Sequence, residues 1–236
     1  MAYQVDKLSV FFPAYNEEAN LPSTIAKAKK VLLKVAKEWE IIIVNDGSKD
    51  KTGEVADRIA KTDKRIKVIH HNPNRGYGGA LKSGLYSAKY PWIAFTDSDG
   101  QFDFAEITNF LTKQKETGAD MVVGYYKKRQ VSKTKIITSK MWEAAVWIAF
   151  GLKVKDIDCG FKLISKKVVD SIQKLQSERG AFISSEFLIK AKKKGFKIVE
   201  IPITHYPRTK GAGTGRDIKV IIQSFIDLFR LWKKLR

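Results

Sequence analysis

The first half of the chain alternates short apolar runs with amphipathic helical patterns. The runs have the length and the β-branched and aromatic content of strands, and they cover Leu8–Phe12, Ile41–Val44, Ile66–Ile69, Trp92–Phe95 and Met121–Val123. Helical patterns over about residues 20–37, 52–61, 80–89 and 104–115 separate them. Parallel strands need crossover connections of this kind. The pattern therefore predicts an α/β fold with a Rossmann-like, mostly parallel central sheet flanked by helices.

The second half is less regular, and we interpret it as a basic elaboration of the same domain. It contains an aromatic helix near Trp142–Phe150, a charged turn at Asp156–Lys162, a helix over about 185–194, a strand at Lys197–Ile203 and a Gly-rich basic loop at Pro207–Arg216. A final helix begins near residue 217. No internal repeat or linker is visible in the sequence. We expect one domain over 1–236, divided into halves at 1–123 and 124–216 and a terminal basic amphipathic helix at 217–236.

Composition excludes several classes of protein. The 236 residues include a single cysteine, Cys159, so an intramolecular disulfide and a zinc site built on several cysteines are excluded. The opening sequence MAYQVDKLSV has no apolar signal core. The longest apolar run, about Ala144–Phe150, is too short to span a bilayer. We therefore expect a cytoplasmic protein whose contact with a membrane, if any, is peripheral.

Charge is distributed unevenly along the chain. Residues 1–123 carry 18 basic and 16 acidic side chains, whereas residues 124–236 carry 26 basic and 9 acidic ones. Such a half favours an anionic partner, which could be nucleic acid, a phosphorylated substrate or lipid headgroups. The sequence has neither a helix-turn-helix pattern nor aromatic-interleaved RNA motifs. We therefore expect no nucleic-acid partner, and a non-enzymatic, basic nucleic-acid-binding protein is the remote alternative.

Polar residues follow the expected strands. Asn16, Asp46, Gly76 and Asp97 each come shortly after one, and in open α/β sheets ligands bind beyond the carboxyl ends of the strands. Asp97 and Asp99 are two residues apart, a spacing that lets two carboxylates converge on one Mg²⁺ or Mn²⁺ ion. Read alone, the same pattern also fits a solvated Asp-rich turn.

A Gly-rich stretch, Asn74–Gly84, lies between a strand and a helix. Glycines at such a turn let backbone N–H groups approach an anion at a helix N-terminus. The stretch matches neither the dinucleotide fingerprint nor a Walker A loop. A tight turn with glycines for close packing explains it equally well.

Four motifs occur in order: Pro-Ala-Tyr-Asn-Glu from Pro13, Asn-Asp-Gly-Ser-Lys-Asp-Lys-Thr from Asn45, Asn-Arg-Gly-Tyr-Gly-Gly-Ala from Asn74 and Asp-Ser-Asp-Gly-Gln from Asp97. Together they resemble family 2 glycosyltransferases of the GT-A fold. Within that family the chain is most similar to the branch of dolichol-phosphate mannose synthases and polyprenyl-phosphate glycosyltransferases. The resemblance covers about residues 8–215.

The resemblance implies a role for each matching residue. A donor nucleotide pocket would be lined by Pro13, Ala14, Tyr15, Glu17, Asp46, Gly76, Lys82, Asp97 and Ser98. A Mg²⁺ or Mn²⁺ ion on the donor diphosphate would be held by Asp97, Asp99 and Gln101. An acceptor phosphate would meet Arg129, Lys162, Arg208 and Lys210, with Lys162 standing where the family often has arginine. The catalytic groups would be Asp99 and Arg208, with Asp156 and Asp158 as candidate bases.

The implied reaction is inverting transfer of a hexose from GDP-mannose or UDP-glucose to a polyprenyl or dolichyl phosphate. An acceptor phosphate is already ionised near neutral pH, so no general base is needed. The alternative acceptor is a saccharide hydroxyl, which needs a carboxylate base, and Asp156 or Asp158 is the candidate.

The last helix bears on how such an acceptor is reached. Apolar residues recur along one side of it: Ile218, Ile221, Ile222, Phe225, Phe229 and Trp232. We expect this stripe to dock on the core, and the alternative is an interfacial helix on an anionic membrane or against a membrane partner subunit. Trp142, Trp147 and Phe150 are expected in the core, and the alternative is a ridge that faces the membrane. His70 and His71 are interpreted as loop residues.

Overall fold

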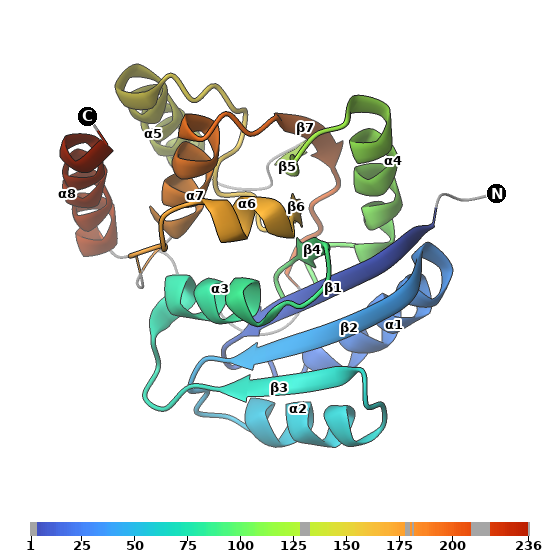
Figure 1. Ribbon diagram of the computed structural model, residues 1–236. Helices are drawn as coiled ribbons and strands as arrows, with labels where there is room; N and C mark the ends of the chain where they lie inside the picture. The colour runs from blue at the N-terminus through green and yellow to red at the C-terminus, as the bar shows by residue number, and fades with distance from the viewer. Residues whose placement is uncertain (1–3, 128–132, 178–179, 181, 209–217, 236) are drawn as a thin grey trace.

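A seven-stranded sheet forms the centre of the part of the chain that the structure describes. The structure is a computed structural model and describes residues 4–127, 133–177, 180, 182–208 and 218–235 (Figure 1). The strand order is β3-β2-β1-β4-β6-β5-β7. The strands are β1 (Val5–Ala14), β2 (Ala36–Asn45), β3 (Ile66–His70), β4 (Trp92–Phe95), β5 (Met121–Tyr126), β6 (Lys162–Ser165) and β7 (Ile198–Ile203).

Strand direction follows the alternation of the sequence, with one exception. β1 pairs in parallel with β2 and β4, β2 with β3, and β5 with β7. β6 runs antiparallel to both of its neighbours, β4 and β5. The mostly parallel sheet expected from the sequence is confirmed.

Helices cover both faces of the sheet, so both faces are apolar (Figure 1). One core packs β-strand residues such as Phe12 and Ile43 against α1 (Leu21–Val35), α2 (Thr52–Lys61) and α4 (Ile107–Thr117). The other packs residues such as Phe11 and Val44 on the opposite side. It is built with α3 (Gly76–Ser87), α5 (Lys133–Phe150), α6 (Lys166–Ser171), α7 (Phe182–Lys193) and α8 (Ile218–Leu235). A short 3₁₀ turn, η1 (Phe104–Glu106), precedes α4.

Two local details differ from the expectation. The charged turn expected at 156–162 is present up to Phe161, but Lys162 begins β6, and α6 follows directly; neither element was expected. β6 has only four residues and begins with a lysine, so the sequence shows no apolar periodicity there. The segment is a strand because it pairs with β4 and β5. The helix expected from about residue 80 begins at Gly76, so the glycines form its first turn.

The two outer helices also differ from expectation. Trp142 of α5 is half-buried against Phe182 and Phe225, but Trp147 is 54% exposed, so its expected core position is wrong. Among the side chains of α8 that the structure describes, Leu228 and Leu231 are buried.

The described members of the stripe expected to dock on the core are therefore less buried than Leu228 and Leu231. Phe225 and Phe229 are 44% and 55% exposed, and Trp232 is half-buried. The side chains of Ile218, Ile221 and Ile222 lie outside the described part. In that part, no helix combines the length and apolar character needed to cross a bilayer.

At Gly84, α3 packs closely against the sheet. A Cβ atom at this position would overlap the ring of Phe11, which stacks on Phe95 in the core with centroids 5.0 Å apart. We expect Gly84→Ala to lower the free energy of unfolding by about 1–3 kcal/mol through overpacking. Urea unfolding measures this, with Ser87→Ala on the exposed end of the same helix as the control. Equal stability of the two variants would contradict this packing.

Candidate functional site

The carboxyl ends of β1, β2 and β4 bring three of the sequence motifs to one edge of the sheet. Asp46 follows β2 and donates its backbone N–H to the carbonyl of Ala14, at 2.9 Å. β6 reaches the same edge because it is antiparallel: its first residue, Lys162, pairs with Phe95, the last residue of β4. Loops from widely separated parts of the chain therefore meet at this edge.

Glu17, Asp99 and Arg208 form an ion-pair cluster at this edge. Arg208 contacts the Glu17 carboxylate through Nη2, and its Nη1 lies 3.4 Å from Asp99 Oδ2. Glu17 is buried, and Asn20 donates to its Oε2 at 2.7 Å. The side chain of Asn20 therefore holds this carboxylate and does not cap α1. Burial raises the pKa of Glu17, although Asn20 and Arg208 oppose this shift.

Asp97 lies beside this cluster, and Tyr77 and Gly160 pack against it. The Tyr77 hydroxyl donates to Asp97 Oδ1 at 3.2 Å. A Cβ atom at Gly160 would overlap the Asp97 carboxyl group. Desolvation, and next the negative charge of Asp99, raise the pKa of Asp97 to about 7. Gly160 was not singled out from the sequence, and only its place against Asp97 gives it significance.

Lys162 is buried within electrostatic range of Asp97. It is 1% exposed, and its ammonium group donates to the carbonyl of Cys159 and lies 5.3 Å from the centre of the Phe95 ring. Burial lowers the pKa of Lys162, while the negative charges of Asp158, Asp156 and Asp97 favour its protonated form. This placement favours neutralisation of the carboxylates over direct contact with an acceptor phosphate.

The donor set at this edge suits a hard divalent cation that completes its shell with substrate oxygens. Asp97 and Asp99 supply carboxylates, which such ions prefer. Gln101 donates its amide nitrogen to the Tyr206 carbonyl at 3.1 Å, which leaves its side-chain oxygen as the atom able to bind a cation. Within the described residues, no group of three or more His, Cys, Asp or Glu side chains is arranged to hold a metal. A diphosphate would therefore have to contribute to the binding.

A second cluster fixes Asp46. His71 Nδ1 lies 2.6 Å from Asp46 Oδ1, and Asn74 and the backbone N–H of Arg75 donate to the carboxylate at 2.8 and 2.9 Å. The other ring nitrogen of His71 lies 2.8 Å from Ser83 Oγ on α3. His71 is 7% exposed, so its interpretation as a loop residue missed a positioning role. The two consecutive histidines gave no signal that distinguished His71 from His70.

The loop after β1 is held in an unusual conformation. Asn16 has φ of 56°, and its side-chain oxygen accepts from the Lys49 backbone at 2.8 Å. Ser98 is buried and donates to the Pro13 carbonyl at 2.7 Å, joining the end of β1 to the loop after β4. The first and fourth motifs are thus linked by a hydrogen bond.

The remaining sequence-predicted residues are placed as follows. Tyr15, Gly76 and Lys82 are partly exposed, the last two on α3. Asp156 is 2% exposed, whereas Asp158 is exposed. Arg129 and Lys210 lie outside the described residues.

Comparison with family models now identifies the chain. The model described as "Glycosyl transferase family 2" matches residues 9–173, more than half of the chain. The chain belongs to glycosyl transferase family 2. The family resemblance read from the four motifs is confirmed.

Some curated relatives of this family 2 member have names that refer to dolichyl or undecaprenyl phosphate, and others do not. The chain is 29% identical to dolichyl-phosphate beta-glucosyltransferase of Saccharomyces cerevisiae, over 84% of this chain and 66% of that one. It is 26% identical to glycosyltransferase AglD of Haloferax volcanii, over 97% of this chain and 37% of that one. It is 30% identical to uncharacterized protein MJ1222 of Methanocaldococcus jannaschii, over 92% and 90%. The chain thus spans about a third to two thirds of the first two of these relatives.

Solved structures match the fold. Glucosyl-3-phosphoglycerate synthase from Mycobacterium tuberculosis, in complex with Mn²⁺, uridine diphosphate and glucosyl-3-phosphoglycerate, superimposes with a TM-score of 0.70 at 20% identity. The match covers 98% of this chain and 80% of that one. At this identity the likeness concerns the fold, and the expected GT-A fold is confirmed.

Gly160 offers a test of how Asp97 is positioned. We expect Gly160→Ala to displace the Asp97 carboxyl group and weaken Mn²⁺ binding in the presence of UDP by about tenfold or more, because ligand geometry is lost. Isothermal titration measures the affinity, and circular dichroism checks folding. Thr112→Ala, on the exposed side of α4, is the control. Unchanged affinity in folded Gly160→Ala would contradict the role of this contact.

The raised pKa of Asp97 predicts a pH-dependent stability. Between about pH 4 and pH 7 the folded, metal-free protein keeps a proton on Asp97 that the unfolded chain has released. The contribution of this group to stability is therefore present at low pH and is lost as pH rises through this range. In chelator, Asp97→Asn should show a smaller fall in melting temperature across the range than the unmodified protein. Parallel curves would contradict the shift.

Proposed function

We propose that this protein transfers a hexose from a nucleotide-sugar to a polyprenyl or dolichyl phosphate, with inversion at the anomeric carbon. The observation that carries the proposal is the cluster of Asp97, Asp99, Glu17 and Arg208 at the strand edge of a family 2 chain. The names of the yeast relative and of related undecaprenyl-phosphate transferases support the acceptor class.

The chemistry follows from where charge develops. As the acceptor oxygen attacks the anomeric carbon, the nucleoside diphosphate leaves with additional negative charge. A divalent cation held by Asp97 and Asp99 would supply electrostatic stabilisation of that leaving group. Arg208, which already contacts Asp99, can turn its guanidinium toward the diphosphate and donate to it.

The nucleotide would lie over the loops after β1 and β2. In this proposal Pro13, Ala14 and Tyr15 line the pocket, Glu17 contacts the ribose and Asp46 contacts the base. Asp46 is held by His71, Asn74 and Arg75, so its orientation is fixed before the nucleotide arrives. Such preorganisation lowers the entropy cost of binding.

The donor to test first is UDP-glucose, because the named relatives include dolichyl-phosphate glucosyltransferases. GDP-mannose is the second donor. The acceptor phosphate would lie near Arg208 and the basic second half of the chain, with Arg129 and Lys210 as further candidate contacts. Work at a membrane surface is part of this proposal, since a polyprenyl chain resides in a bilayer.

A saccharide hydroxyl acceptor is the second candidate. It needs a base, and Asp158 is better placed than Asp156 to meet an acceptor because it is exposed while Asp156 is 2% exposed.

Nucleotide release tests the proposal. The purified protein is mixed with Mn²⁺ and UDP-glucose or GDP-mannose, with and without a short-chain polyprenyl phosphate. We expect release that needs both the metal and the lipid phosphate. Asp99→Ala should lower it by about 100-fold or more, because the leaving-group charge loses its stabilisation.

Two further variants complete the test: one separates the two acceptor classes, and the other is a control. Asp158→Asn should leave transfer to the lipid phosphate within about threefold, since a phosphate needs no base. Asp170→Ala, an exposed substitution on α6, is the matched control for Asp99→Ala. Full activity of Asp99→Ala would overturn the proposal. Nucleotide release stimulated only by saccharides would instead support the saccharide hydroxyl as the acceptor.

A further inference from the structure

An apolar stripe runs along the solvent side of α5. Ile137, Met141 and Ile148 are 59%, 62% and 79% exposed, and Ala144 between them is also exposed. Their spacing of four, three and four residues places them on one side of the helix. Trp147, next to this stripe, is 54% exposed. The opposite side of α5 is apolar as well, with Val146 fully buried, so the helix is apolar on both its core and its solvent side.

A second apolar stripe lies on α8. Phe225, Ile226 and Phe229 are 44%, 41% and 55% exposed. The ring of Phe225 lies 5.1 Å, centroid to centroid, from that of Trp142 on α5, so the two helices are neighbours. We call the exposed set the docking face: Ile137, Met141, Trp147, Ile148, Phe225, Ile226 and Phe229.

The docking face is a concentration, not a scatter. Among the described residues, it holds seven of the ten large apolar side chains that are exposed, the others being Leu33, Tyr86 and Tyr206. Isolated exposed apolar residues are normal, whereas many of them on two neighbouring helices indicate a partner or a membrane.

Cations accompany this face. Lys140 on α5 and Arg230, Lys233 and Lys234 on α8 are exposed. The acidic residues of these two helices, Glu143 and Asp227, are already paired with Lys140 and Arg230. A surface with aromatic and aliphatic side chains and an excess of lysine and arginine is typical of a helix that lies at an anionic bilayer.

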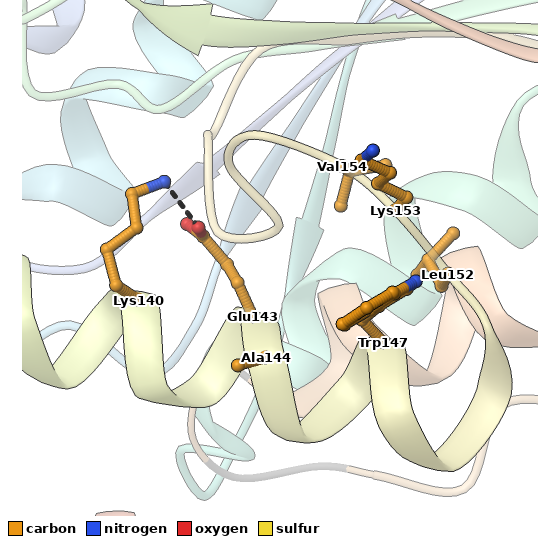
Figure 2. Close-up of a pocket in the computed structure, with 7 residues that line it drawn as sticks. All are labelled: Lys140, Glu143, Ala144, Trp147, Leu152, Lys153 and Val154. Atoms are coloured by element: carbon orange, nitrogen blue, oxygen red, sulfur yellow. Dashed lines mark hydrogen bonds and ion pairs between the residues drawn. The ribbon is translucent and has the colours of Figure 1, made fainter.

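A hollow of about 250 Å³ adjoins the docking face (Figure 2). Figure 2 shows it between α5 and the segment Leu152–Val154, with Trp147 beside Leu152 and the Lys140–Glu143 ion pair at the other end. Lys153 also lines it. Apolar walls next to ammonium groups suit an amphipathic molecule with an anionic head.

We propose that the docking face lies on an anionic lipid bilayer, with its apolar side chains at headgroup depth and its cations on lipid phosphates. A second copy of the chain fits less well, because a symmetric contact would bring cations of the same sign together. The inference rests on the proposed function only for why a bilayer matters: the acceptor would reside in it. In Figure 1, β1, β2 and β3 run toward the side of the molecule on which α8 lies, so their carboxyl ends are on that side.

Vesicle sedimentation tests this surface without any nucleotide-sugar. The protein should partition onto vesicles of phosphatidylcholine mixed with phosphatidylserine and far less onto phosphatidylcholine alone. Ile148→Glu on α5 and Phe229→Glu on α8 should each weaken partition by about tenfold or more, since each removes an inserted apolar group and adds a negative charge. The matched control is Leu33→Glu, which makes the same change of charge at a 56% exposed site on α1.

Trp147 provides a second readout. Its emission, taken as the difference between the protein and Trp147→Phe, should shift to the blue when anionic vesicles are added. Equal partition of Ile148→Glu, Phe229→Glu and Leu33→Glu would overturn the proposal. So would a dimer in light scattering that Ile148→Glu dissociates, in a protein that does not bind vesicles.

Nucleotide binding separates this inference from the proposed function. The Mn²⁺-dependent affinity for UDP in solution should be the same in Ile148→Glu and in the unmodified protein, because the docking face is outside the carboxylate cluster. Vesicle binding without any nucleotide binding would refute the proposed function and leave the docking face standing. Nucleotide binding without vesicle binding would refute the docking face and leave the proposed function standing.

Discussion

The ion pairs of Arg208 with Glu17 and Asp99 are the interaction on which the functional edge depends. Acidic side chains from the loops after β1 and β4 are gathered in a partly desolvated place, where like charges repel strongly. Arg208, which is 191 residues from Glu17 in sequence, offsets that repulsion from one side. The positive charge of the buried Lys162 offsets it at Asp97. The edge is therefore stable only when the second half of the chain is folded against the first.

The antiparallel strand β6 makes that arrangement possible. By entering the sheet between β4 and β5 in the reverse direction, it begins at the edge where β4 ends, and it carries Gly160 and Lys162 to Asp97. The absence of a side chain at Gly160 lets backbone pack against a carboxyl group. The raised pKa of Asp97 and the lowered pKa of Lys162 share this cause, since both groups are removed from water by the same packing.

The surplus of basic residues in the second half has two separate consequences. Arg208 and Lys162 act within the carboxylate edge, where they balance charge. Lysines and arginines of α5 and α8 remain exposed around an apolar face. A single count of charge cannot distinguish these uses, because one depends on burial and the other on exposure.

Much of the fold followed from the sequence. The alternation of apolar runs and helical patterns predicted the strands β1 to β5 and the parallel sheet, since local periodicity reflects burial on two faces. The Asp97–Asp99 and Asn74–Gly84 motifs predicted which edge carries polar chemistry. β6 was missed because four residues starting with a lysine carry no periodic signal.

What the sequence by itself determined was the family, the class of fold and the residue types at the strand ends. The tertiary structure alone decided that Gly160 packs on Asp97, that His71 holds Asp46, and that Phe225 and Phe229 of α8 are exposed while Leu228 and Leu231 pack inward. The physical reason is that periodicity records which residues are apolar, whereas contacts between distant segments record which of them find a partner.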